Sequence, residues 1–176
     1  MDISNLKNII LVAPAPEHKQ AAMDFRREWG NNHIDGGAGL NKYENYEDWL
    51  RDIEKNKNKY KPLPGSVPGS VYFGIFNEKI IGMVAVRHYL NEALLIRGGH
   101  IGYGVRPSER RKGYATRMLA LALGECKKLR IPKVLLTCDK DNKASARVIE
   151  KNGGVLENEF TDDSGGVILR YWIKIN

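Results

Sequence analysis

The sequence predicts a mixed α/β (α+β) fold in which a β-sheet is covered by helices. Three observations lead to this prediction. Apolar stretches of strand length alternate with segments of helical periodicity. Short polar turns join successive strands into hairpins. The 176 residues, 42% of them hydrophobic and 28% charged, are enough to form one full-sized core. We therefore expect a single domain over residues 1–176, with the element order βααβββαβαββ.

The first part of the chain begins with a strand and two helices. The strand is expected over Ile9–Ala13 and the first helix over Glu17–Trp29, whose apolar side chains return to one face. A glycine-rich loop over Gly30–Lys42 follows, and a loop with three prolines covers Lys61–Ser70. Between these loops, a second helix is indicated by the i, i+3, i+4, i+7 spacing of Tyr46, Trp49, Leu50 and Ile53.

Three strands are expected next, and the first two form a hairpin. Val71–Phe76 and Ile80–Arg87 flank the short turn Asn77–Lys79. After a longer excursion over 87–99, the third strand covers His100–Val105.

The remaining sequence alternates helices and strands. A helix of about four turns precedes a buried-type strand over Lys133–Cys138. A short helix over Asn142–Asn152 then ends at two glycines, and Val155–Phe160 and Val167–Ile175 form a closing hairpin. The strand–helix–strand unit from His100 to Cys138 is expected to be parallel and right-handed. One face of its helix carries Ala115, Met118, Leu119, Ala122, Cys126 and Leu129.

Composition limits the partners. The net charge of +7 favours an anionic cofactor, an acidic substrate or nucleic acid, with scattered surface lysines as the bland alternative. No apolar run is long enough to span a membrane, Met1–Asn8 has no apolar signal region, and two cysteines provide no disulfide framework. We therefore expect a cytoplasmic protein without a membrane partner. A homodimer stays open, and no motif indicates a metal.

The segment from Arg110 to Ala115 has the features of a phosphate cradle. It reads Arg-Arg-Lys-Gly-Tyr-Ala and lies between the strand ending at Val105 and a helix that opens at Gly113. A glycine lets backbone N–H groups approach an anion, and the helix adds the positive end of its dipole. The structural alternative is a tight glycine turn with solvated arginines. The strand-to-helix setting favours a phosphorylated cofactor.

These residues resemble the GNAT superfamily of N-acetyltransferases, and within it a bacterial branch. Val105 to Ala115 is similar to the superfamily's acetyl-CoA pyrophosphate loop, and Asp141 to Arg147 to its next motif, in which Asn and Ser open a short helix. The resemblance implies a centrally splayed sheet and acetyl-CoA as co-substrate, with backbone pairing between the pantetheine arm and the strand at Tyr103 and Val105. It implies cofactor contacts by Val105, Arg110, Arg111, Lys112, Gly113, Tyr114, Ala115, Thr116, Asn142 and Ser145. For Asn142 and Ser145, capping of the helix is as good an explanation as contact with the cofactor, and both roles can coexist.

The catalytic groups stay open at this level. An amine must lose a proton before it attacks a thioester. His100 lies beside the cofactor strand and titrates near neutrality, but strand alternation turns it away from Tyr103 unless a bulge intervenes. The general-acid tyrosine of many GNAT enzymes falls at Ile149, so Tyr103, Tyr114 or Tyr171 would have to substitute for it. The candidate bases are His100, Glu92, Asp139, His33 and Asp35.

We expect an acetyl-CoA-dependent N-acetyltransferase acting on a primary amine of a small molecule or peptide. Direct attack is favoured because Cys126 falls on a core face and Cys138 has no histidine nearby in sequence. The glycine-rich loop with His33 and Asp35, and the proline-rich loop, are expected to contact the acceptor. One alternative is a module that binds acyl-CoA without chemistry, which the missing tyrosine favours. Another is a nucleic-acid-binding protein, ranked lower because no aromatic stacking motif accompanies the basic cluster.

Overall fold

The computed structural model describes residues 6, 8–58, 65–162 and 164–175, so residues 61–64 of the proline-rich loop lie outside the described part. The order of elements confirms the expected mixed α/β fold, with one added helix, α3. The elements are β1 (Ile10–Val12), α1 (Lys19–Arg27), α2 (Tyr46–Asn56), β2 (Gly69–Phe76), β3 (Lys79–Arg87), α3 (Glu92–Ile96), β4 (Ile101–Val105), α4 (Tyr114–Lys128), β5 (Lys133–Asp139), α5 (Lys143–Lys151), β6 (Val155–Thr161) and β7 (Val167–Lys174). Within these ranges, no helix is both long and apolar enough to cross a membrane.

Helix α3 lies in the excursion that sequence patterns left without an element. The side chain of Asn91 begins it by accepting a hydrogen bond from the Leu94 N–H at 3.0 Å. The helix has only five residues, which is too few for an apolar periodicity to become visible.

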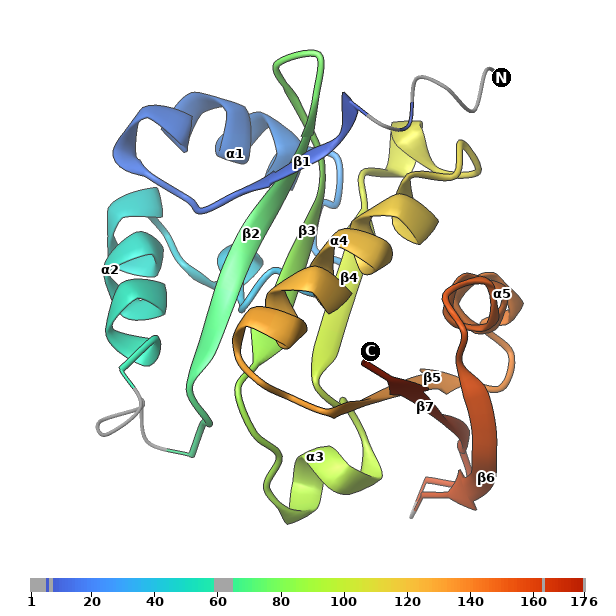
Figure 1. Cartoon of the computed structure of the whole chain (residues 1–176). Helices are drawn as coiled ribbons and strands as arrows, with labels where there is room; N and C mark the ends of the chain where they lie inside the picture. Colours follow the sequence, from blue (N-terminus) through green and yellow to red (C-terminus); the bar gives the residue numbers. More distant parts are fainter. Residues whose placement is uncertain (1–5, 7, 59–64, 163, 176) are drawn as a thin grey trace.

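The strands form two sheets that separate between β4 and β5. One sheet has the antiparallel order β1-β2-β3-β4 and the other the order β5-β7-β6. Among the described residues no ladder joins β4 to β5, although the His100 N–H donates to the Leu135 carbonyl at 2.7 Å where the strands begin. The parallel pair expected from the sequence is thus divided between two sheets by a cleft that residues of β4, β5 and α5 line. Helix α5 lies across this division from β4 (Figure 1).

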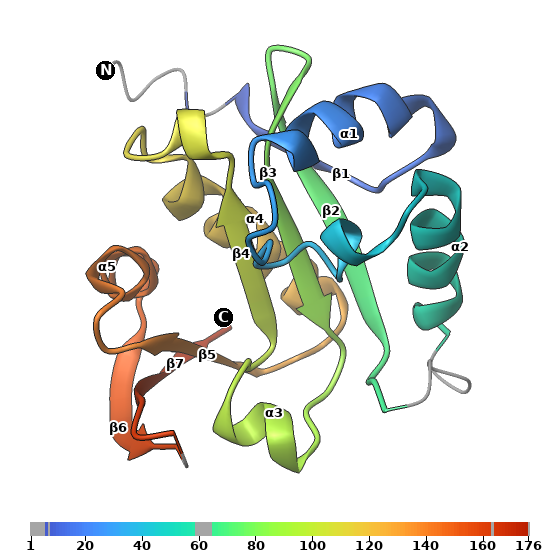
Figure 2. The same ribbon diagram turned by 180° about the vertical axis from the view of Figure 1, so that it is seen from behind.

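Helices cover both faces of the first sheet. Val84 and Val86 belong to the core beneath α4, whereas Phe73 and Met83 belong to the core beneath α1 and α2. This division follows from the alternation of side chains along a strand. Figure 1 shows α4 in front of β3 and β4, and Figure 2 shows the loop after α1 crossing the opposite face.

Glycines on β4 allow that loop to lie directly on the sheet. A Cβ at Gly104 would be 2.7 Å from the Asp35 carbonyl oxygen, and one at Gly36 would be 2.5 Å from the Gly102 carbonyl oxygen. Gly36 also has φ of +72°, which a glycine adopts at no steric cost. The close contact carries His33 and Asp35 to the edge of the cleft.

Candidate active site

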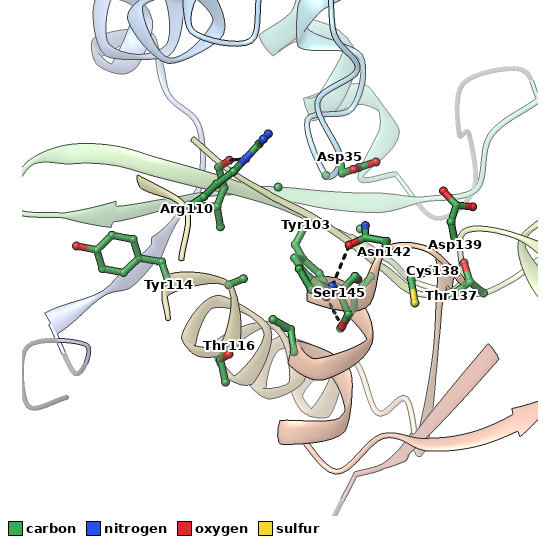
Figure 3. Close-up of a pocket in the computed structure, with 18 of the residues that line it drawn as sticks. Asp35, Tyr103, Arg110, Tyr114, Thr116, Thr137, Cys138, Asp139, Asn142 and Ser145 are labelled. Carbon is green, nitrogen blue, oxygen red and sulfur yellow. Dashed lines mark hydrogen bonds between the residues drawn. The ribbon is translucent and has the colours of Figure 1, made fainter. Parts of the chain in front are cut away.

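A cavity of about 630 Å³ fills the cleft between the two sheets. It is bounded by β4, the start of α4, the end of β5, the start of α5 and the loop after α1 (Figure 3). Most of the residues singled out in the sequence line it, and Lys112 and His100 do not. The lining members are His33, Asp35, Tyr103, Val105, Arg110, Arg111, Gly113, Tyr114, Ala115, Thr116, Cys138, Asp139, Asn142 and Ser145.

Strand β4 turns one backbone edge toward this cavity, and on that edge the Val105 carbonyl accepts a hydrogen bond from Arg110 Nε at 3.3 Å. The Arg87 N–H donates to the His100 carbonyl at 2.7 Å, and the Arg106 N–H to the Ile81 carbonyl at 2.8 Å. Because antiparallel residues alternate in the direction of their backbone groups, these bonds fix the phase along β4. The backbone groups of Tyr103 and Val105 therefore point away from β3, into the cleft.

The turn before α4 is a backbone nest for an anion. Arg111 and Gly113 have φ of +64° and +82°, and no side chain caps the helix that begins at Tyr114. Left-handed residues in such a turn direct neighbouring backbone N–H groups toward one side. The first N–H groups of the helix also have no hydrogen-bond partner within the helix. A left-handed conformation at Arg111 costs about 1–2 kcal/mol, and strain of this kind concentrates at functional sites. The residues present fit a diphosphate.

Side chains around the nest divide into those that face the cavity and those that do not. The Arg110 guanidinium lies 5.0 Å from the centre of the Trp29 ring. The Lys112 ammonium is held 2.7 Å from Glu109, which also pairs with Lys79 at 2.7 Å, so one carboxylate serves two lysines. The Tyr114 ring packs on Phe76 in the core, with ring centres 5.5 Å apart, so only its backbone is available to a ligand.

Opposite the nest, Tyr103 and the start of α5 form a polar pair. The Tyr103 hydroxyl lies 2.8 Å from Ser145 Oγ, and the Ser145 N–H donates to Asn142 Oδ1 at 3.0 Å, so Asn142 caps the helix (Figure 3). Burial raises the pKa of Tyr103 above its ordinary value, so the phenol keeps its proton at neutral pH. Ile149 is fully buried and packs on Gly154, so the position expected for a general acid belongs to the core.

His100 is engaged in the fold at the point where the two sheets meet. Its buried ring accepts a hydrogen bond from the Leu135 N–H at Nδ1, at 2.9 Å. Burial, with a smaller effect from the Arg87 charge, lowers the pKa of His100 to about 4. The β3–β4 register is continuous from Ile101 to Val105, so no bulge turns the ring toward Tyr103.

We predict that His100 makes stability depend on pH. Its folded pKa of about 4 lies below the ordinary value of 6.5, so the unfolded chain binds more protons between these two pH values. The urea midpoint of the wild type is therefore expected to fall as pH drops from 6.5 to 4. In His100→Gln, which keeps an acceptor for Leu135, this part of the pH dependence should shrink. An unchanged pH dependence in the variant would contradict this role.

The other candidate acids, bases and nucleophiles differ in their ion pairs, their position relative to the cavity and their protonation. His33 Nε2 and Asp35 Oδ1 lie 3.5 Å apart at the exposed rim, whereas Asp139 is paired with Arg97 at 2.7 Å. Glu92, at the start of α3, does not line the cavity. Burial raises the pKa of Cys138 and raises that of Cys126 to about 12, so both stay thiols. Across the described residues, no cluster of three or more His, Cys, Asp or Glu side chains is arranged to hold a metal ion.

Several residues of the cavity were not singled out in the sequence. Arg87, Arg97 and Thr137 line it, and the Thr137 Oγ1 accepts the Gly98 N–H at 2.8 Å. They lie outside both motifs, and no local pattern distinguishes them. The one available signal was Gly98-Gly99 at the end of the excursion, a pair that suits a close backbone approach.

Comparison with known proteins identifies the family. No curated protein matches the chain significantly. MccE, the microcin C7 self-immunity acetyltransferase in complex with acetyl-CoA and AMP, is 20% identical with a TM-score of 0.70, over 96% of this chain and 93% of that one. RimL, a ribosomal L7/L12 α-N-protein acetyltransferase in complex with coenzyme A, is 17% identical with a TM-score of 0.69, over 96% and 94%. RimJ from Mycobacterium smegmatis, in complex with CoA-disulfide, is 16% identical with a TM-score of 0.70, over 94% and 81%. At these identities the likeness establishes the fold. The acetyltransferase (GNAT) domain model matches residues 8–155, so the chain belongs to the GNAT acetyltransferase family.

Proposed function

We propose that the protein transfers an acetyl group from acetyl-CoA to a primary amine by direct attack. The observation that carries the proposal is that one cavity contains three features: the backbone edge of β4 at Tyr103, the uncapped start of α4, and the Tyr103–Ser145 pair. Family membership supports the reaction. Acetyl-CoA, when bound, supplies an acetyl thioester at one end and a diphosphate at the other.

The residues present fit both ends of that molecule. Backbone N–H groups from Arg111 to Thr116 hold the diphosphate, with Arg110 adding charge at the rim. The outward backbone groups of Tyr103 and the outward N–H of Val105 bind the extended arm as an added strand would, while the Val105 carbonyl accepts from Arg110 Nε. Asn142 borders the same channel while it caps α5. MccE and RimL, of the same fold, were crystallised with acetyl-CoA and coenzyme A respectively.

We assign the two proton transfers to Tyr103 and to the His33–Asp35 pair, which line the same cavity. Tyr103 donates a proton to the departing thiolate, because burial keeps its hydroxyl protonated. The His33–Asp35 pair, at the rim, accepts a proton from the attacking amine. Direct attack is supported because both cysteines stay protonated, and a thiol is a poor nucleophile.

The acceptor is a primary amine on a small molecule or a peptide. A nucleic-acid-binding role is disfavoured by the basic cluster itself. Arg106 is buried and lies 3.2 Å from Glu28, and Lys112 shares the Glu109 carboxylate with Lys79, so carboxylates offset part of the cluster's charge. Binding of acyl-CoA without chemistry is the second candidate. It is favoured by the apolar Ile149, which falls where, by the family resemblance, many GNAT enzymes have a general-acid tyrosine.

Release of free thiol from acetyl-CoA, measured across a panel of primary amines, tests the proposal. Amine-dependent thiol release, with acetylated amine as the product, is the expected result. Tight binding of acetyl-CoA with no turnover on any amine would favour the non-catalytic role. Salt-dependent binding of DNA or RNA that acetyl-CoA does not displace would favour the nucleic-acid role.

A further inference from the structure

A second cavity, of about 450 Å³, adjoins the first. His33, Gly36 and Arg87 line both cavities, so they mark the place where the two meet. The second cavity is bounded by α2, β2, β3 and the start of α3. Its wall is largely apolar, with Ile34, Val67, Val71 and Leu94 among its residues.

Arg87 is a cation at this junction that no carboxylate of the described residues pairs with. Its half-buried guanidinium donates from Nη1 to the carbonyls of Gly98 and Gly99, at 3.1 and 3.0 Å. Burial lowers the pKa of Arg87, and across the described residues no carboxylate counteracts that effect. An arginine nevertheless stays charged at neutral pH. A desolvated charge satisfied only by neutral carbonyls is incompletely compensated.

Two nearby arginines, unlike Arg87, are paired with carboxylates. Arg97 reaches Asp139 at 2.7 Å and Asp162 at 3.0 Å, and Arg106 reaches Glu28 at 3.2 Å. Arg87 differs from these two arginines because it lines both cavities and, among the described residues, has no carboxylate partner.

We propose that Arg87 binds an oxyanion of the acceptor, and that the acceptor is a small amine with a carboxylate or phosphate close to its amino group. The inference rests on the proposed acetyl transfer. A guanidinium matches carboxylate and phosphate oxygens in a bidentate manner. Because Arg87 lines both cavities, the oxyanion lies between an amino group in the first cavity and an apolar body in the second.

The charges around the junction suit such a zwitterion. Asp35, paired with His33 at the rim, attracts an ammonium group, while Arg87 attracts the oxyanion. Asp52, the acidic residue of the second cavity, accepts from the Tyr43 hydroxyl at 2.9 Å and lies 3.8 Å from Lys55. Its charge is thus already offset. A protein N-terminus carries no oxyanion at a fixed short distance from its amine, so small acceptors are favoured.

Matched acceptor pairs test this assignment. One pair is an α-amino acid and its amide; the other is an aminoalkyl phosphate and the corresponding amino alcohol. The variant is Arg87→Gln, whose amide can still donate to the Gly98 and Gly99 carbonyls. Arg27→Gln, which removes an exposed arginine on α1 that pairs with Asp24 at 3.1 Å, controls for loss of one positive charge.

We expect kcat/KM of the wild type to favour the anionic member of at least one pair by about 30-fold, the usual weight of a charge-assisted hydrogen bond. The preferred pair distinguishes carboxylate from phosphate. Arg87→Gln should abolish the preference and Arg27→Gln should retain it. Arg87→Lys keeps the charge without the bidentate geometry, so it should keep part of the preference for the anionic acceptor. This variant replaces Arg87→Gln in the test if Arg87→Gln does not fold.

Three results would overturn the assignment. The wild type could treat both members of each pair alike, or Arg87→Gln could lower turnover of the charged and neutral members by the same factor. Either result contradicts the oxyanion site and leaves acetyl transfer standing. Absence of turnover with every amine would contradict acetyl transfer, and the oxyanion site with it.

Discussion

Replacing Gly113 by aspartate is expected to weaken binding of coenzyme A by at least about 100-fold. Gly113 has φ of +82° and stands immediately before α4, where no side chain caps the helix. An aspartate there brings a carboxylate to the positive end of the helix and competes with a diphosphate for the same N–H groups. Left-handed strain of about 1–2 kcal/mol adds to the loss of charge-assisted hydrogen bonds, each worth about 1.5–3 kcal/mol.

Two matched variants separate these contributions. Gly113→Asn has nearly the same shape, tolerates a left-handed backbone and carries no charge, so it should bind more tightly than Gly113→Asp. Gly124→Asp introduces the same residue at an exposed position of α4, where a new Cβ meets no atom within 4 Å, and should bind like the wild type. Titration calorimetry with coenzyme A gives the affinities of the wild type and the three variants. Equal affinity of Gly113→Asp and wild type would refute the diphosphate cradle.

The cradle could be predicted from sequence because its parts are contiguous. Val105, Gly113 and the helix after it follow one another within a few residues, so strand end, turn and helix start can be recognised together. Asn142 and Ser145 are a local pair of the same kind, joined by a helix cap. Hydrophobic periodicity likewise predicted the order of the long elements, because each buries one face.

What could not be predicted depends on contacts between distant segments. The role of His100 follows from Leu135, which approaches only because the two sheets part at that point. Lys112 belongs to the expected motif, yet it shares Glu109 with Lys79, which β3 brings there from another part of the chain. Arg87 had no sequence signal at all, since a cation at a strand end is ordinary until a cavity opens beside it. The sequence therefore indicated the proposed diphosphate cradle more directly than the surroundings of the proposed acceptor site.

Replacing Tyr103 by phenylalanine is expected to lower kcat for acetyl transfer by about 100-fold, at the lower end of the usual contribution of a general acid. The effect is placed at that end because a thiolate leaves readily, with a reference pKa near 8.5. Burial raises the pKa of Tyr103 above its ordinary value, so the acid form persists below that raised pKa, including the neutral range. The wild-type rate should therefore show no alkaline fall from this group near neutrality.

Separate measurement of kcat and KM distinguishes a catalytic role of the Tyr103 hydroxyl from a packing role. Phenylalanine retains the ring in place, so KM for acetyl-CoA should change by less than about threefold while kcat falls, as expected for an interaction made in the transition state. Ser145→Ala removes the partner 2.8 Å from the hydroxyl but keeps the acid, and should cost less than Tyr103→Phe. Tyr89→Phe, at an exposed tyrosine outside both cavities, should behave like the wild type. A Tyr103→Phe enzyme with undiminished kcat would leave the hydroxyl as a brace between β4 and α5, and the thiolate would then depart without protonation by the protein.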